Sequence, residues 1–288
     1  MPPSLPVETP LDPAALRAWP LPEDQQDDKH GRGTVLVVGG SLETPGAAIL
    51  AGVAALRMGA GRLQIATAAE IAGHLAVAVP EALVTAYDEE RATSLRERIA
   101  AADAVVVGPG LSDPDRAAGL LSVVFDHAAR DAIVVVDAMG IAALLALSER
   151  VNGGVPVIVT PNREELARLV DGGPAATSPE LFVARKYGVT VVCFGRIATP
   201  DGRCWVDSGE VTGLGTSGAG DILAGAIGGV AARSHEVPTA AGWATLSHRI
   251  AANHAAAAIA PVGYLAREVV DELPRALAEL QRLVRQSE

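Results

Sequence analysis

The chain has few aromatic residues, few cysteines and almost no lysine. Phe, Trp and Tyr make up 3% of its 288 residues, whereas 49% are hydrophobic, so aliphatic side chains must form most of the core. Cys193 and Cys204 are too few for a disulfide framework. Because Lys29 and Lys186 are its only lysines, we expect phosphate groups to be bound by arginine or by backbone amides.

Long apolar runs and a basic surface are also missing. The first residues have neither the basic region nor the apolar run of a signal peptide, and the apolar segment Ala252–Ala260 is too short to cross a membrane. We therefore expect a cytoplasmic protein that contacts no membrane. The net charge of −11 argues against nucleic acid as a partner, although a local cradle can still bind a small anion.

Short apolar strands alternate with helical segments along most of the chain. The runs expected to be buried strands are 34–39, 62–67, 104–107, 133–136, 157–160 and 189–194. Strands that are apolar throughout predict a mostly parallel sheet covered by helices on both faces, a three-layer α/β/α fold. We expect residues 1–30 to be an N-terminal arm with a short helix near Ala14–Trp19, and residues 31–288 to be a single domain ending in three successive helices from Asp221 onward.

Glycine, asparagine and aspartate follow the expected strands. These residues are Gly39-Gly40, Gly108-Pro109-Gly110, Asp137, Asn162 and Gly195. Each alone is typical of an ordinary turn. Ligands of parallel sheets bind beyond the carboxyl ends of the strands, so five such turns at one edge predict a binding site there. Asp137 is either a turn residue or a group that binds Mg²⁺ or orients a substrate.

The segment from Gly213 to Asp221 is the most informative part of the sequence. Glycine occupies four of its nine positions, and an apolar helical segment follows directly. Such a loop presents free backbone N–H groups to an anion at a helix N-terminus. Asp221 then lies where a base could accept the proton of a hydroxyl group that receives a phosphoryl group. The alternative is a first-turn acid favoured by the helix dipole, with glycines that allow close helix packing.

Asn162 and Glu165 open the helix after the strand at 157–160. Their spacing is that of a capping box, in which both side chains hydrogen-bond the backbone of the first turn. The functional alternative places Glu165 near a Mg²⁺ ion, through water, beside phosphate groups.

Together these residues resemble the ribokinase-like superfamily, in which a Gly-Ala-Gly-Asp loop forms an anion hole and its Asp is the base. Three further motifs resemble the ADP/ATP-dependent NAD(P)H-hydrate dehydratase family. They are Val37-Val-Gly-Gly-Ser41, Pro45-Gly-Ala-Ala48 leading to Ala54-Ala-Leu-Arg-Met-Gly-Ala-Gly61, and Val107-Gly-Pro-Gly-Leu111. The resemblance runs from about residue 30 to about residue 285, in the order of the family's motifs.

This resemblance implies a ribokinase-like fold and a repair reaction. Members of the family dehydrate (S)-NADHX and (S)-NADPHX to NADH and NADPH, and bacterial members use ADP and release AMP and phosphate. Hydroxide leaves poorly, so the ring hydroxyl is phosphorylated and phosphate then leaves. The resemblance further implies Mg²⁺, a homo-oligomer, often a tetramer, and a separate epimerase, because only about 30 residues precede the first expected strand.

The site residues are carried over position by position. By this resemblance Asp221 is the catalytic base and touches the substrate hydroxyl. Ala47, Gly110 and Asn162 would contact the hydrated nicotinamide nucleotide, and Glu165 would hold Mg²⁺ through water. The residues expected to bind ADP are Gly195, Arg196, Ser217, Gly218, Ala219 and Gly220.

Three motifs depart from the family pattern. Asn162 stands where many members have His, and Phe194 stands where many have a Lys before Gly195. Ser217-Gly-Ala-Gly-Asp221 replaces the usual Gly-Gly-Thr-Gly-Asp, and Arg196 could take the place of the lost Lys. In all three motifs the departure makes the sequence more similar to the kinases of the superfamily. A ribokinase-like kinase of a vitamin precursor or sugar, and a non-catalytic nucleotide-binding regulator on the same fold, are therefore the alternatives.

Overall fold

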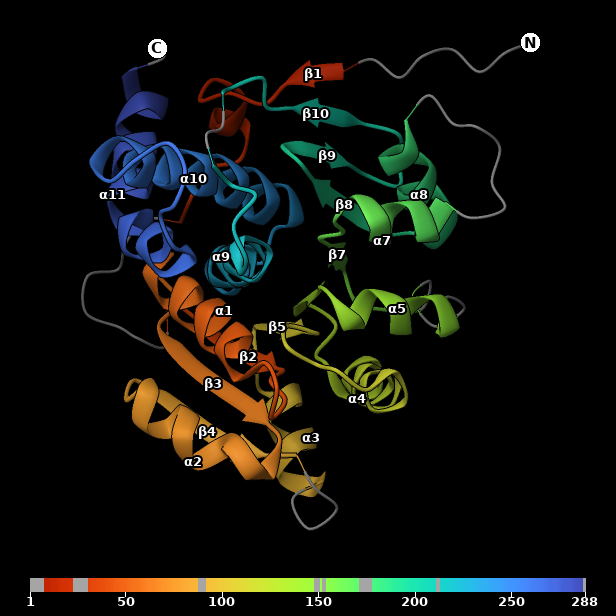
Figure 1. Ribbon diagram of the computed structural model, residues 1–288. Coiled ribbons are helices and arrows are strands. Elements are labelled where there is room, and N and C mark those ends of the chain that lie inside the picture. Colours follow the sequence, from red (N-terminus) through yellow and green to blue (C-terminus); the bar gives the residue numbers. More distant parts are fainter. Residues whose placement is uncertain are drawn as a thin grey trace.

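A single mixed sheet forms the centre of the computed structural model, which describes residues 8–22, 31–87, 92–147, 151, 154–170, 178–210 and 213–286 (Figure 1). The strand order is β1-β10-β9-β8-β7-β6-β5-β2-β3-β4. Among the described strands, only β9 runs antiparallel to the strands on both of its sides. The strands are β1 (Glu8–Pro10), β2 (Thr34–Val38), β3 (Arg62–Thr67), β4 (Ala82–Ala86), β5 (Ala104–Val107), β6 (Ile133–Val136), β7 (Val157–Val159), β8 (Thr190–Cys193), β9 (Arg196–Ala198) and β10 (Cys204–Val206).

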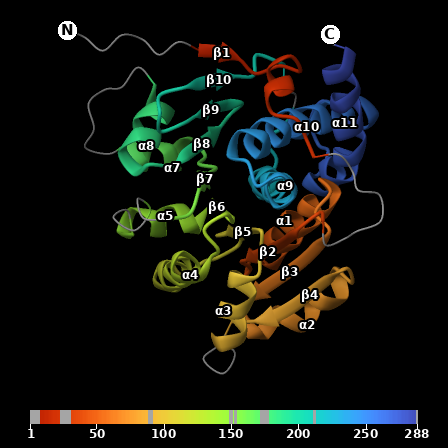
Figure 2. The ribbon, with the colours of Figure 1, turned by 180° about the vertical axis from the view of Figure 1, so that it is seen from behind.

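Helices cover both faces of this sheet (Figures 1 and 2). One face packs against α1 (Pro45–Arg57), α2 (Ala69–Ala78), α9 (Ala219–Ser234), α10 (Val237–Ala258) and α11 (Ala266–Gln286). The other packs against α3 (Ala92–Ala100), α4 (Pro114–His127), α5 (Met139–Ala146), α7 (Arg163–Val170) and α8 (Pro179–Tyr187). Successive residues of β2 point into opposite cores, Val35 into one and Leu36 into the other, so the strand is apolar from Val35 to Val38. The predicted three-layer fold is confirmed.

The apolar strands lie within a residue or two of their predicted bounds. The three C-terminal helices are also present, as α9, α10 and α11. The strands that the sequence did not indicate are β1, β4, β9 and β10, which have three to five residues each. Their side chains do not form a long apolar run, and β1 and β4 lie at the two edges of the sheet.

Residues 8–22 are packed against the C-terminal helices and the sheet. β1 pairs with β10, and the 3₁₀ helix η1 (Ala15–Ala18) carries the fully buried Leu16. The ring of Trp19 meets that of Trp205 edge-on at 4.9 Å, and the indole N–H of Trp243 donates to the Trp19 carbonyl at 2.7 Å. The predicted arm therefore contributes to the core over its described part, while its boundary at residue 30 falls outside the described residues.

Glycines bring α9 against α1. A Cβ at Gly225 would lie 2.0 Å from the Ala51 carbonyl oxygen, and one at Gly229 would lie 2.4 Å from the Ala55 carbonyl oxygen. The two helix backbones therefore touch. This contact holds the N-terminus of α9, with Asp221 in its first turn, beside the N-terminal half of α1.

The helices offer no membrane-spanning segment. Among those the structure describes, none combines the length and the apolar character needed to cross a bilayer.

Candidate functional site

The loops after β2 and β5 meet at the carboxyl edge of the sheet. The Gly40 amide donates to the Pro109 carbonyl at 2.8 Å, and the Thr44 hydroxyl donates to the Gly110 carbonyl at 2.9 Å. Gly110 has φ +69°, and a Cβ there would lie 3.0 Å from the Cβ of Ala47. Ala47 and Gly110, both predicted to contact the substrate, are thus neighbours on one wall of this edge.

The glycine-rich loop lies next to that wall and ends at the N-terminus of α9. Gly218 is the N-cap with φ +91°, and no side chain caps the helix. A Cβ at Gly218 would lie 2.6 Å from Leu50, which is one turn beyond Ala47 on α1. Ser217 and Gly220 are exposed, and the space at Gly220 is open. The first backbone N–H groups of α9 are therefore accessible to an anion.

Three carboxylates face the same edge, and two of them have raised pKa values. Burial raises the pKa of Asp221 to about 6. Burial, followed by the negative charges of Asp221 and Glu165, raises the pKa of Asp137 to about 7, against the hydrogen bond that Thr160 donates to it at 2.7 Å. Carboxyl groups with pKa values in this range are suited to proton transfer near neutral pH, and they are found in active sites more often than elsewhere.

Ala138 follows Asp137 in a strained conformation. Its φ of +48° and ψ of −123° belong to a region that glycine occupies readily and alanine does not. The Ala138 amide donates to the Asp137 carboxylate, and α5 begins at the next residue. The strain therefore holds a backbone donor on the buried aspartate.

Asn162 and Glu165 form the capping box that their spacing predicts. The Asn162 side-chain oxygen accepts from the Glu164 and Glu165 amides at 2.9 and 3.0 Å, and the Glu165 carboxylate accepts from the Asn162 amide at 2.9 Å. The structural role is thus confirmed. Contact of Asn162 with substrate, and of Glu165 with Mg²⁺, stays a prediction.

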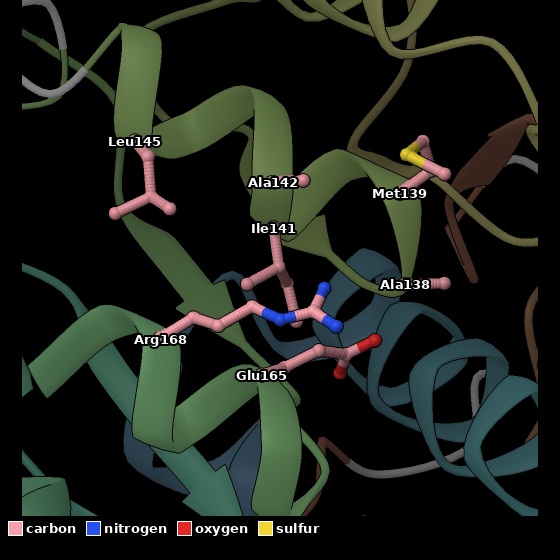
Figure 3. Close-up of a pocket in the computed structure, with 7 residues that line it drawn as sticks. All are labelled: Ala138, Met139, Ile141, Ala142, Leu145, Glu165 and Arg168. Atoms are coloured by element: carbon pink, nitrogen blue, oxygen red, sulfur yellow. The ribbon is translucent and has the colours of Figure 1, made fainter. Parts of the chain in front are cut away.

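A small cavity of about 80 Å³ lies beside Glu165, between α5 and α7 (Figure 3). In Figure 3 the Glu165 carboxylate extends toward the turn at Ala138, and Arg168 reaches into the same space from the next turn of α7. This volume holds a few water molecules and not a nucleotide.

The turn between β8 and β9 places Gly195 and Arg196 at the same edge. Gly195 has φ +76°. Arg196 forms ion pairs with Glu8 and with Glu180, the latter at 3.6 Å. Its guanidinium is thus already engaged, and its predicted contact with ADP stays untested.

A second arginine at this turn was not singled out from the sequence. The Arg163 guanidinium lies 4.6 Å from the centroid of the exposed Phe194 ring, in cation–π contact. Its position beside Asn162 in the motif is the only sequence signal. Thr160, which holds Asp137, was missed for a similar reason, because their contact joins two neighbouring strands.

The carboxylates form an open site and not a closed metal cage. In the described parts of the chain no three His, Cys, Asp or Glu side chains are placed to bind one metal ion. Mg²⁺ commonly keeps several waters and uses one or two carboxylates together with substrate phosphates. Glu165 and Asp137 therefore fit such an ion, provided that a nucleotide supplies the remaining ligands.

Comparison with known proteins gives consistent relatives. The model of the NAD(P)H-hydrate dehydratase family matches residues 35–275. The chain is 43% identical to an ADP-dependent (S)-NAD(P)H-hydrate dehydratase of Xanthomonas campestris, over 93% of this chain and 96% of the relative. It is 33% identical to a bifunctional NAD(P)H-hydrate repair enzyme of Moorella thermoacetica, of which it covers half.

Solved structures have the same fold. The ADP/ATP-dependent NAD(P)H-hydrate dehydratase of Bacillus subtilis, co-crystallised with ATP and Mg²⁺, superposes with a TM-score of 0.76 and 28% identity, covering 95% of this chain and 99% of that one. A hydroxyethylthiazole kinase of Pyrococcus horikoshii superposes with a TM-score of 0.59 at 20% identity, over 88% of this chain and 92% of that one, and so shares the fold alone.

Proposed function

This chain belongs to the NAD(P)H-hydrate dehydratase family, and we propose that it is an ADP-dependent (S)-NAD(P)H-hydrate dehydratase, a lyase that returns NADHX and NADPHX to NADH and NADPH. The observation that carries the proposal is the position of Asp221. Its carboxyl group, with a pKa raised to about 6, lies at an uncapped helix N-terminus beside the wall made by Ala47 and Gly110.

The reaction divides into a phosphoryl transfer and an elimination. The ring hydroxyl of the hydrate attacks the β-phosphorus of ADP, a new O–P bond forms, and AMP leaves as the old P–O bond breaks. Asp221 accepts the hydroxyl proton, so this residue must be ionised beforehand. Phosphate then leaves with the C–O bonding electrons, and loss of a neighbouring ring proton restores the double bond. The products are the reduced cofactor, AMP and phosphate.

Backbone amides stabilise the charge on the transferring group. The N–H groups around Ser217, Gly218, Ala219 and Gly220 point at the space in front of α9, where negative charge develops on the phosphoryl oxygens. In this proposal Gly195 and Arg196 contact ADP, and Ala47, Gly110 and Asn162 contact the nicotinamide nucleotide. Bound Mg²⁺ would lie at Glu165, through water, and near Asp137, and would neutralise phosphate charge.

Three further parts of the proposal concern the assembly and the surroundings. The bifunctional repair enzyme of Moorella, of which this chain covers half, supports an epimerase as its metabolic partner. Exposed Ile259, Val262 and Leu265 between α10 and α11 support burial in a homotetramer. Two free, buried cysteines agree with a cytoplasmic protein.

The test is a direct assay of the hydrate. Purified protein, Mg²⁺ and NADHX are mixed with ADP or with ATP, and the near-ultraviolet absorbance of NADH is followed. We expect it to rise with ADP and to stay flat without a nucleotide. A flat trace with both nucleotides, from folded protein that binds them, would contradict the proposal. A stable phosphate ester as product would identify a kinase instead.

A further inference from the structure

A second, much larger cavity lies at the carboxyl edge, away from the α9 loop. Its volume is about 700 Å³, and it opens between α2, α3 and α4 beyond the ends of β3 and β4. Those two strands form the end of the sheet opposite β1 (Figure 1). The residues that matter in its lining are Glu70, Tyr87, Leu95, Arg96, Arg116 and Leu120.

The described lining of this cavity carries more positive than negative side chains. Its described residues include two arginines and one acid, Glu70, whereas the net charge of the whole chain is −11. Arg96 and Arg116 are both exposed, and neither guanidinium has a carboxylate partner in the described parts of the chain. Arg116 contacts the Tyr87 side chain, and an arginine without a carboxylate partner is suited to phosphate, which it can bind through two parallel hydrogen bonds.

Apolar surface lies beside these charges. Leu95, Leu120 and the Tyr87 ring line the cavity, and the Arg116 guanidinium lies 5.8 Å from the Tyr87 centroid. Sites for small molecules commonly combine apolar walls with a few polar groups that set the orientation. A base and ribose fit the walls, and their phosphates fit the two arginines.

Tyr87 connects this cavity to the predicted nicotinamide site. Its hydroxyl donates to the Gly40 carbonyl at 2.9 Å. Gly40 lies between the two sites, because its Cα is 3.3 Å from the position of a Cβ on Gly110. Tyr87 therefore joins the lining of the cavity to the loop that packs against the wall of Ala47 and Gly110.

We propose that this cavity binds the adenosine half of the dinucleotide substrate, with Arg96 and Arg116 on its phosphates. The proposal rests on the proposed function and extends it from the reacting ring to the remainder of the substrate. In the proposed function the wall at Ala47 and Gly110 binds the nicotinamide nucleotide, and a dinucleotide contains a second nucleotide besides it. In the same proposal the loop before α9 binds ADP, so the second half of the substrate requires a separate binding site.

The test compares a full and a truncated substrate. Arg96→Gln with Arg116→Gln should raise the KM for NADHX by about ten-fold, the loss expected when charged contacts to phosphate are removed, and leave kcat nearly unchanged. The KM for hydrated reduced nicotinamide mononucleotide, which lacks the adenosine half, should not change. Arg130→Gln, an exposed arginine after α4 outside the cavity, is the matched control.

Three results would overturn the proposal. They are an unchanged KM for NADHX, an equal rise for both hydrates, and a rise confined to the KM for ADP, which would assign the cavity to the donor. Binding of unhydrated NADPH, followed by its fluorescence, gives a readout that needs no turnover. If the wild type fails to convert NADHX, the proposed function fails. A weaker NADPH complex in the double variant alone would still support the cavity, and unchanged binding would refute it.

Discussion

At the level of single residues, two aspartates and one alanine set the chemistry of the carboxyl edge. Burial alone raises the pKa of Asp221, whereas Asp137 is buried more completely and also faces the charges of Asp221 and Glu165. Two buried carboxyls with pKa values raised towards neutrality are expected of groups that take part in proton transfer. Ala138 adds a donor to Asp137 at the expense of backbone strain.

Replacing Asp221 separates binding from turnover. We expect Asp221→Asn to lower kcat by at least about a hundred-fold, because the base is lost, while ADP binding is kept by the backbone amides. Calorimetric titration with ADP and the absorbance assay measure the two quantities. Near wild-type turnover in this variant would remove Asp221 from the mechanism and leave a nucleotide-binding regulator as the better description.

The pKa of Asp221 also predicts the pH profile. Because the base must be ionised, kcat/KM should fall as the pH decreases through about 6, the value of the free protein. Measurement of kcat/KM for NADHX from about pH 5 to about pH 8, a range that spans the expected titration of Asp221, checks this. If kcat/KM decreased only near the ordinary pKa of aspartate, burial would not raise the pKa of Asp221.

Asp137 should make the fold less stable as the pH rises. Its pKa is near 3.8 when unfolded and about 7 when folded, so the folded protein holds more protons between these values. The free energy of unfolding therefore decreases from about pH 4 to about pH 7. Asp137→Asn should reduce this dependence on pH. Near pH 8, its free energy of unfolding in urea titrations should exceed that of the wild type by at least about 1 kcal/mol. An unchanged slope would show that Asp137 ionises at its ordinary pKa.

At the level of elements, the contact between α1 and α9 decides where the anion cradle lies. Glycines at 225 and 229 serve close packing against α1, and Gly218 also lies close to Leu50 of that helix, whereas the space at Gly220 in front of α9 is open. The same helix thus uses glycine for two purposes. Packing holds one end of α9 so that the other end can present its amides.

Gly225→Ala should test this contact. The added Cβ would lie 2.0 Å from the Ala51 carbonyl oxygen, so α9 must shift, and we expect a loss of about 2 kcal/mol of stability together with reduced activity. Gly119→Ala in α4, where the space is open, is the control and should be neutral or stabilise by up to about 1 kcal/mol. Equal urea midpoints for both variants would argue against close packing of α1 and α9.

At the level of the whole molecule, the described N-terminal residues belong to the same core as the C-terminal helices. Leu16 is fully buried among residues more than two hundred positions away, and Trp19 joins Trp205 and Trp243. We expect Leu16→Ala to cost about 2 to 5 kcal/mol, in contrast to Val77→Ala on the exposed face of α2. A small, equal change in both would show that residues 8–22 are an independent arm.

Much of the architecture could be predicted from local patterns. The runs that became β5 and β6 are apolar at every position, and the run that became β2 is apolar after Thr34. Both faces of these strands are covered, and this signal needs no knowledge of neighbours. The turns at their ends, the capping box of Asn162 and Glu165, and the motif ending at Asp221 are equally local. Each could be recognised because its residues are close in sequence.

What required the tertiary structure was every relation between distant segments. The engagement of Arg196 by Glu8 and Glu180, the hydrogen bond from Thr160 to Asp137, and the link from Tyr87 to Gly40 join residues from separate strands and loops. No local pattern encodes such pairs, because they depend on strand order and helix packing. The sequence by itself predicted most of the groups at the candidate site. The folded chain decided which of them are free, which are paired and how far their pKa values move, since burial and charge are properties of the assembled edge.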